Sequence, residues 1–425
     1  MINRIVLTLV FTLSFLTFLA PELTVSVQIV PLILFGGLVI VRVFFSPSIL
    51  RATGSLLEMD GLLFVVLLSS WMIGPSLAST DGKSFNYALL FVLCLILARM
   101  YMTIVPIREV LEAFFWSGIV CMVLLVPLSF STLMGSMQTL DRFSFVNLKT
   151  NLLAFLLIGY LWVMVWKFRT GEWRMRVLTG AVSMVCMVMV FFASSRAALV
   201  GSFAGCCFGI GMALMKAGKD RRKQLARRII LTIAVLLVSL FLVRSSSWFY
   251  NVSEFVDQVL AITEPSRGIG SGFTGRLGVW STTVSTLSDG SWLTGKGLRS
   301  SDSLYPMIDN SYLVILYDLG VFPLILITWR FLSILWRAAK AYFRAGDKPQ
   351  QQFCLACGLL MVVLLVTNVS ERYLFAVGNP YSLLAFLFFA TPSSVLRLAL
   401  EPSTKNLKTP VVWPQGQDLS SSGAY

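Results

Sequence analysis

Apolar runs of about 17 to 25 residues recur along nearly the whole chain, separated by short polar segments. This is the length that a helix needs to cross a bilayer, whereas a membrane β-barrel shows short segments of alternating polarity. The pattern therefore predicts an all-α polytopic membrane protein. We expect about twelve transmembrane helices, near residues 5–20, 26–45, 61–79, 85–105, 111–130, 150–166, 176–193, 197–215, 228–243, 311–329, 352–370 and 380–396.

One connection is much longer than the others and lies between the ninth and tenth predicted spans, at residues 244–309. The segments WFYNVSEFVDQVLAI and TGRLGVWSTTVSTLSDG within it carry apolar residues at helical spacing, with the glycine cluster RGIGSGFTG between them. They predict two amphipathic helices that lie on the membrane face. A structured cap without activity is one interpretation, but long structured loops are more often functional.

The long loop separates two groups of predicted transmembrane helices. We expect helices 1–9 within residues 1–243 and helices 10–12 within residues 310–400. The tail at 401–425 is rich in Pro, Ser and Gly, which predicts a disordered segment.

Charge is sparse but strongly biased in position. Only 13% of the 425 residues are charged, and the net charge is +14. With the N-terminus inside, most of the 34 Lys and Arg lie in inside segments, including KFRTGEWRMR, KAGKDRRKQLARR and residues 330–348. The positive-inside rule then predicts that both termini are cytoplasmic and the long loop is outside, which in a bacterium is the periplasmic face of the inner membrane. The basic loops indicate topology and contacts with anionic membrane lipids, so we expect no nucleic-acid partner.

No residue set in the sequence predicts a metal or a cofactor. The chain has no histidine, and its 7 cysteines lie in apolar stretches. Cys354 and Cys357 form a CxxC pair, but neither a second pair nor a histidine completes a zinc site. We interpret the cysteines as buried small apolar residues.

Cations on the outside are the candidates for chemistry, because topology does not require them. Arg196 lies in FFASSRAALVGSFAG, between two apolar runs with almost no loop. A charge there is costly unless it is paired, faces an aqueous cavity or snorkels to the interface. Gly201, Gly205 and Gly209 follow it as a small-xxx-small stripe, which favours close helix packing.

Arg276 precedes Trp280 by about one helical turn on the second helix of the long loop. It is either a solvated surface residue or, together with Arg196, part of a clamp for a diphosphate. Guanidinium suits that role because it offers planar, bidentate donors to phosphate oxygens. Lys296 and Arg299 are two further outside cations that we assign to substrate binding.

Asp309 begins the stretch DNSYLVILYDLG, where a polar approach enters an apolar run. Asp, Asn and Ser are preferred just before a helix, so Asp309 is a candidate N-cap. It is also a candidate general base that takes a proton from a hydroxyl nucleophile. The sequence supports both interpretations, and Asn310 and Tyr312 are candidates for positioning the substrate.

Four motifs in order, SSRAALVG, GRLGVW, LTGKGL and DNSYLVILYDLG, make the stretch from Arg142 to Gly378 resemble the O-antigen ligase and polysaccharide polymerase superfamily. The resemblance implies metal-independent transfer of glycan, with inversion, from an undecaprenyl-diphosphate donor to an acceptor hydroxyl. It also implies that Arg196 and Arg276 bind the diphosphate. Arg142 and Asn151, in DRFSFVNLKTNLLAFL, match the family more weakly as further substrate-binding residues.

The resemblance also bears on the subfamily. Lipopolysaccharide ligases carry His-Asn where this chain has Asp309-Asn310. The DN-x-Y-L form, with NVSE ending at Glu371, looks more like exopolysaccharide polymerases, so Glu371 is another candidate for substrate binding. We expect a periplasmic-face glycosyltransferase that polymerises lipid-linked repeat units, with flippase and chain-length regulator proteins as partners. A ligase of the same fold, a GT-C-type glycosyltransferase and a lipid-linked glycan flippase are the alternatives.

Overall fold

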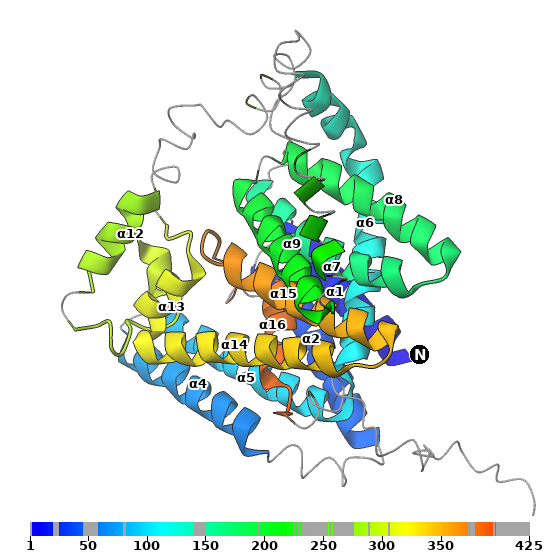
Figure 1. Ribbon diagram of the computed structural model, residues 1–425. Helices are drawn as coiled ribbons and strands as arrows, with labels where there is room; N and C mark the ends of the chain where they lie inside the picture. The colour runs from blue at the N-terminus through cyan, green and yellow to red at the C-terminus, as the bar shows by residue number, and fades with distance from the viewer. Residues whose placement is uncertain are drawn as a thin grey trace, which may run out of the picture.

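The computed structural model is all-helical over the residues that it describes, with no β-strand among them (Figure 1). Those residues are 2–19, 25–45, 58–79, 82–139, 150–193, 195–218, 276–287, 290–304, 307–372 and 379–393, with isolated positions within 220–234 and at 254, 257, 374 and 396. The helices are α1 (Ile2–Leu19), α2 (Val25–Phe45), α4 (Met59–Ala78), α5 (Gly82–Ile104), α6 (Ile107–Thr139), α7 (Thr150–Thr170), α8 (Trp173–Phe192), α9 (Arg196–Lys216), α12 (Arg276–Ser285), the 3-10 helix η2 (Ser300–Ser303), α13 (Ser311–Leu319), α14 (Val321–Arg344), α15 (Lys348–Thr367) and α16 (Pro380–Ala390).

Several of these helices suit a membrane, as the apolar pattern predicts. Within the described part of the chain, seven are long and apolar enough to cross one: Gly61–Ala78, Gly82–Ile104, Ile107–Pro127, Trp173–Phe192, Arg196–Lys216, Val321–Arg344 and Lys348–Thr367. Most of the predicted span at 228–243, most of the loop at 244–309 and the whole tail at 401–425 lie outside the described residues. The count of twelve spans therefore stays a prediction.

The predicted span at 311–329 is instead two helices that meet at Gly320. α13 ends at Leu319 after 9 residues, and α14 runs on to Arg344. Gly320 has a φ of 88°, which other residues rarely adopt, and a Cβ there would collide with the Leu293 carbonyl oxygen. The membrane-length helix is therefore α14, and the prediction was wrong about where this span begins and ends.

The sequence pattern places Arg330 in an inside loop. In the structure, however, Arg330 lies within α14. Its side chain is fully buried, and its Nε and Nη2 donate to the carbonyls of Phe389 at 3.0 Å and Thr391 at 2.6 Å. Arg99 of α5 donates its Nη1 to the carbonyl of Ala390 at 3.0 Å. The two guanidiniums thus satisfy consecutive carbonyls at the C-terminus of α16, where unpaired acceptors and the helix dipole both favour cations.

α15 and α16 form the centre of the bundle. Every residue of α16 is buried, and 67% of the apolar window of α15 is buried against 22% of that of α9. α15 packs on α7, α9 and α14, and α16 packs on α4 and α5 (Figure 1). The peripheral helices therefore present their apolar side chains outward, as expected for a protein in lipid.

One end of this bundle collects the start of α13, the end of α15 and the end of α4. The amide of Ser311 donates to the Asn368 carbonyl at 2.9 Å, which joins the first two. The amide of Leu298, in the turn before η2, donates to Ser76 Oγ on α4 at 3.0 Å. The candidate site lies at this end.

Candidate functional site

Arg276, the first residue of α12, lies between two carboxylates. Its Nε is 3.6 Å from Asp309 Oδ2, and its Nη2 is 3.6 Å from Glu371 Oε1. The three side chains differ in access to solvent: 47% of Asp309 is exposed, against 18% of Arg276 and 5% of Glu371. Asp309 is therefore the most accessible of the three side chains to a ligand.

Asp309 is not the N-cap of α13. The cap is Asn310, whose Oδ1 accepts the amides of Tyr312 at 2.9 Å and Leu313 at 3.1 Å. Asp309 precedes the cap, and its carboxylate turns toward Arg276. The capping interpretation of Asp309 was therefore wrong, because the next residue already supplies the acceptor that the helix start requires.

The chain after α15 is tied to the start of α13 by Ser311. The Ser311 amide donates to the carbonyls of Asn368 and Glu371 at 2.9 Å and 3.2 Å. Its Oγ lies 2.7 Å from Asn368 Oδ1 and 2.7 Å from the Glu371 carbonyl oxygen. Two segments that are far apart in sequence are thereby fixed together, which sets the distance between Glu371 and Asp309.

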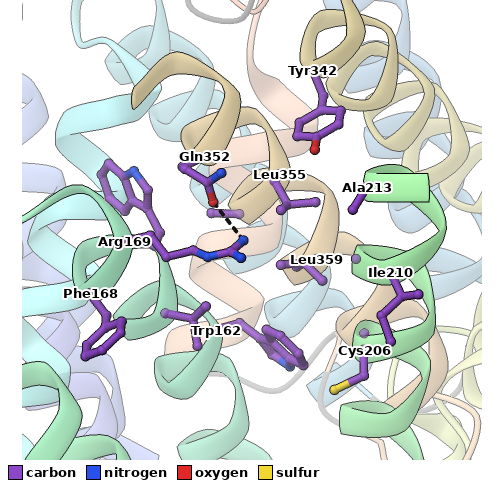
Figure 2. A pocket seen from close by; sticks show the side chains of 15 residues that line it. Trp162, Phe168, Arg169, Cys206, Ile210, Ala213, Tyr342, Gln352, Leu355 and Leu359 are labelled. Atoms are coloured by element: carbon purple, nitrogen blue, oxygen red, sulfur yellow. Dashed lines mark hydrogen bonds between the residues drawn. The ribbon is translucent and has the colours of Figure 1, made fainter. Parts of the chain in front are cut away.

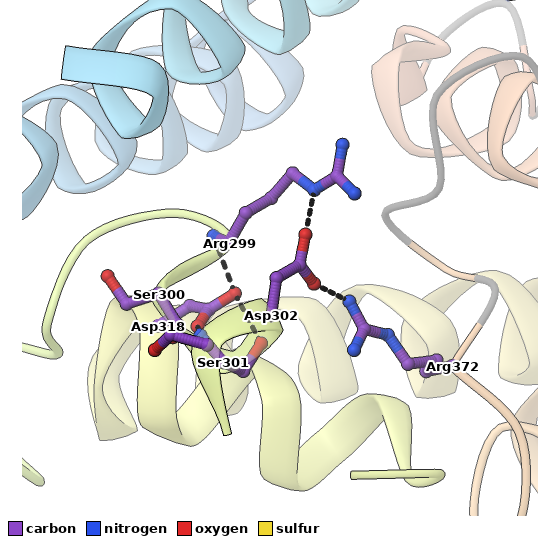
Figure 3. Close-up of polar contacts among 7 residues, drawn as sticks. Arg299, Ser300, Ser301, Asp302, Asp318 and Arg372 are labelled. Carbon is purple, nitrogen blue, oxygen red and sulfur yellow. Dashed lines mark hydrogen bonds and ion pairs between the residues drawn. The ribbon is translucent and has the colours of Figure 1, made fainter. Parts of the chain in front are cut away.

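Arg299, Asp302 and Arg372 form a second group of ion pairs (Figure 3). Asp302 of η2 accepts the Nε of Arg299 at 2.6 Å and is also bonded to the guanidinium of Arg372. Arg372 directly follows Glu371, so the two groups are continuous along the chain. We call the whole set the ion-pair cluster; it consists of Arg276, Arg299, Asp302, Asp309, Glu371 and Arg372.

Asp318 holds η2 and the turn before it against α13. Its carboxylate accepts the amides of Arg299 and Ser301, both at 2.8 Å, and the Ser301 hydroxyl at 3.2 Å (Figure 3). Burial raises the pKa of Asp318 from 3.8 to about 7, and the donors from Ser301 and Arg299 partly oppose that shift. Asp318 lies in α13, before the membrane-length helix α14, and its hydrogen bonds account for an acid in this buried position.

Three of the expected substrate-binding side chains contact neighbouring protein groups. Lys296 Nζ donates to the Thr286 carbonyl at 3.3 Å and lies 5.3 Å from the Tyr317 ring centroid. Tyr312 Oη donates to the Leu365 carbonyl at 2.7 Å, and burial raises the pKa of this phenol. Asn310 caps α13. Their predicted contacts with substrate stay predictions.

Arg196 begins α9, directly after the N-cap Ser195. α9 runs antiparallel to α15: a Cβ at Gly201 would meet the Thr367 methyl, and one at Gly209 would meet Leu359. Gly201 thus lies level with Thr367, the last residue of α15, and Arg196 lies five residues further toward the N-terminus of α9. Arg196 and the ion-pair cluster therefore lie at the same end of the bundle.

The structure does not describe the side chains of the other two expected substrate-binding residues, Arg142 and Asn151. Arg142 lies outside the described residues, and Asn151 falls in the first turn of α7, with its side chain also outside them. The sequence pattern assigned a functional role to neither Asp302 nor Arg372. Arg372 had a signal, since it follows Glu371 directly, whereas nothing in the sequence pairs Asp302 with a residue 70 positions away.

Within the described part of the chain, no group of three His, Cys, Asp or Glu side chains is placed to hold a metal ion. A comparison with known protein families finds no matching family model, and a comparison with curated proteins finds no similar sequence. The chemistry of the ion-pair cluster therefore has to carry the functional proposal.

Proposed function

We propose that this protein is a metal-independent glycosyltransferase that polymerises undecaprenyl-diphosphate-linked repeat units into exopolysaccharide or O-antigen. The proposal combines the sequence resemblance with one observation. The half-exposed carboxylate of Asp309 lies beside the Arg276 guanidinium, at the end of the bundle where Arg196 also lies. An acid to receive a proton and cations to receive a diphosphate are the two groups that this reaction needs.

The reaction runs as an inverting displacement. The hydroxyl of an acceptor unit attacks the anomeric carbon of the donor, and the bond from that carbon to the phosphate oxygen breaks. Asp309 takes the hydroxyl proton, and the electron pair leaves on the diphosphate. Arg196 and Arg276 stabilise the charge that builds there, as preorganised cations do in other transfer reactions.

The carboxylates around Arg276 have a role in this scheme. Without substrate, Asp309 and Glu371 share the guanidinium, which prevents an uncompensated buried charge. A diphosphate competes for Arg276 and weakens its contact with Asp309. The Asp309 carboxylate is then released to accept the proton of the acceptor hydroxyl.

Arg299 and Arg372 are two further cations in the ion-pair cluster. Both contact Asp302, so a single acid balances two guanidiniums in this half of the cluster. We assign them to the donor's second phosphate or to the diphosphate of the acceptor. The acyl tails of both substrates lie between helices in the membrane, which keeps the reacting groups in one plane and raises their effective concentration.

The test is polymerisation by purified protein in liposomes that contain a lipid-linked repeat unit. Wild type is expected to give a ladder of polymer on the lipid carrier. Arg276→Ala, Arg196→Ala and Asp309→Ala are each expected to lower the rate by about a hundredfold or more, the usual cost of a lost electrostatic or acid–base group. Arg174→Ala, which removes a cation from the other end of the bundle, is the matched control and should keep full activity.

The same assay separates the alternatives. Adding lipid A core as acceptor tests the ligase, which would give single transfers and no ladder. Movement of the lipid-linked unit across the bilayer without any new glycosidic bond would identify a flippase. Full activity of Asp309→Asn would remove the base from the mechanism, and full activity of Arg276→Ala would end the proposal.

A further inference from the structure

A crevice of about 640 Å³ opens between α7, α9, α14 and α15 (Figure 2). It lies at the end of the bundle opposite the ion-pair cluster, where α15 begins and the other three helices end. Its walls are mainly aliphatic and aromatic: Cys206 and Ile210 of α9 face Leu355 and Leu359 of α15, with Trp162 of α7 as the floor. Such a lining suits a hydrocarbon chain.

Small residues of α9 allow close helix packing along one side of the crevice. Gly205 lies so close to the Trp162 indole that a Cβ there would collide with the ring, and a Cβ at Gly209 would meet Leu359. α9 therefore approaches α7 and α15 closely along this stripe. Ala213, about one turn beyond Gly209, also lines the crevice. The polar lining residues Arg169 and Gln352 form the mouth of the crevice at the same end of the bundle.

A guanidinium occupies that mouth. Arg169, in the last turn of α7, is exposed, and its Nη1 donates to Gln352 Oε1 at 3.0 Å across the crevice (Figure 2). None of the carboxylates in the described part of the chain pairs with Arg169. A neutral amide therefore orients this charge without balancing it, and the guanidinium keeps donors for an anion.

A second cation lies near Arg169. Lys216 ends α9 and donates its Nζ to the carbonyls of Tyr342 at 2.7 Å and Ala345 at 3.1 Å, beside the crevice. Glu112 pairs with Lys167, Asp347 caps α15, and Glu172 is exposed at the start of α8. The described residues that line the crevice include Arg169 and no acid, so the lining is cationic at the mouth and apolar inside.

We propose that the crevice binds an anionic membrane phospholipid, with its phosphate on Arg169 and one acyl chain between α9 and α15. A planar guanidinium matches phosphate oxygens in bidentate geometry, and burial of the chain supplies the apolar part of the affinity. Anionic lipids gather at basic segments beside membrane helices, and this end of the bundle carries such segments. Free phosphate has the anion without the chain, so the crevice should hold it only weakly.

The experiment is native mass spectrometry of the full-length protein in detergent, titrated with phosphatidylglycerol and phosphatidylcholine of the same acyl chains. Phosphatidylglycerol is expected to bind more tightly. Arg169→Gln should weaken it by about tenfold, the cost of one charge-assisted hydrogen bond. Arg174→Gln removes an exposed arginine that lies over Trp173, and it should bind as wild type. Ala213→Phe, which places a large ring in the lining of the crevice, should weaken the binding of both lipids.

Several results would overturn the proposal. One is equal binding of the two lipids by wild type. Another is unchanged phosphatidylglycerol binding by Arg169→Gln, which should fold because the side chain is exposed. Full displacement of the lipid by inorganic phosphate would show that the acyl chain contributes nothing to binding. Unchanged binding of both lipids by a monodisperse Ala213→Phe variant would show that the acyl chain does not lie in the crevice.

Discussion

Asp309 and Asn310 are neighbours in the chain with different structural roles. The Asn310 carboxamide closes the first turn of α13, while the Asp309 carboxylate reaches Arg276 of α12 at 3.6 Å. The helix start therefore does not depend on Asp309. This separation leaves the acid at position 309 available for chemistry, and it leads to a direct comparison of two alanine variants.

Asn310→Ala should lower the free energy of unfolding by about 1 kcal/mol, because two amides of the first turn lose their acceptor. Asp309→Ala should cost less than half of this, because a half-exposed ion pair contributes little. Thermal unfolding of both variants in the same detergent gives the comparison. A larger loss from Asp309→Ala than from Asn310→Ala would mean that the two roles are reversed.

Asp318 should make stability fall as the pH rises from about 4 to about 7. Its pKa is raised to about 7 in the fold, so the folded protein binds this proton more tightly than the unfolded chain across that window. Stability is highest while Asp318 is neutral and is lost as the group ionises. The unfolding midpoints at pH 5 and pH 8, compared between wild type and Asp318→Asn, isolate this group. Identical pH dependence in the two proteins would contradict the assignment.

Arg330→Met should destabilise the bundle by roughly 3 kcal/mol, because it leaves the Phe389 and Thr391 carbonyls without their donor. Methionine keeps much of the length and flexibility of the side chain, so the lost hydrogen bonds dominate. Arg344→Met, at the exposed end of the same helix, is the matched control and should change stability by less than about 0.5 kcal/mol. Unfolding temperature and yield of monodisperse protein measure both. Equal behaviour of the two variants would show that the buried arginine has no special structural role.

Gly320→Ala should cost at least about 2 kcal/mol, since the backbone at this position is one that only glycine adopts without strain. The added methyl group would also displace the Leu293 carbonyl, and with it the turn before η2. Gly278→Ala is the control: Gly278 lies in α12 with open space around it, so alanine there should be neutral or slightly stabilising. Limited proteolysis of the segment 290–304 would detect the displaced turn, and an intact segment would count against it.

The fold class could be predicted because bilayer thickness sets the length of an apolar helix, and that length is visible in the sequence. The start and end of α14 could not, because the apolar run passes through Gly320 without a break, and only the contact with Leu293 shows why the chain turns there. The sequence pattern also misplaced Arg330, because it does not show the long-range contact that holds this side chain. Its acceptors lie on α16, about 60 residues later, and hydropathy gives no information about that pairing.

The candidate site was predictable in part. Arg276, Asp309 and Glu371 were singled out from the sequence, and the structure brings them together. The partner of Arg372 was not predictable, because Asp302 lies in a turn without a pattern. The outcome for Asn310 and Asp309 shows a further limit: adjacent capping residues are equivalent in sequence, and only backbone direction at the helix start distinguishes them.

The way in which α16 ends also limits the order in which the protein is assembled. In the part of the chain that the structure describes, α16 has 11 residues, fewer than the ~20 that a transmembrane helix needs. The donors described for its terminal carbonyls come from α5 and α14. α16 therefore has to wait for those two helices to be inserted, and synthesis from the N-terminus provides them first. Truncation before residue 380 should consequently leave a nascent chain with two buried arginines exposed, a state that membrane quality control can recognise.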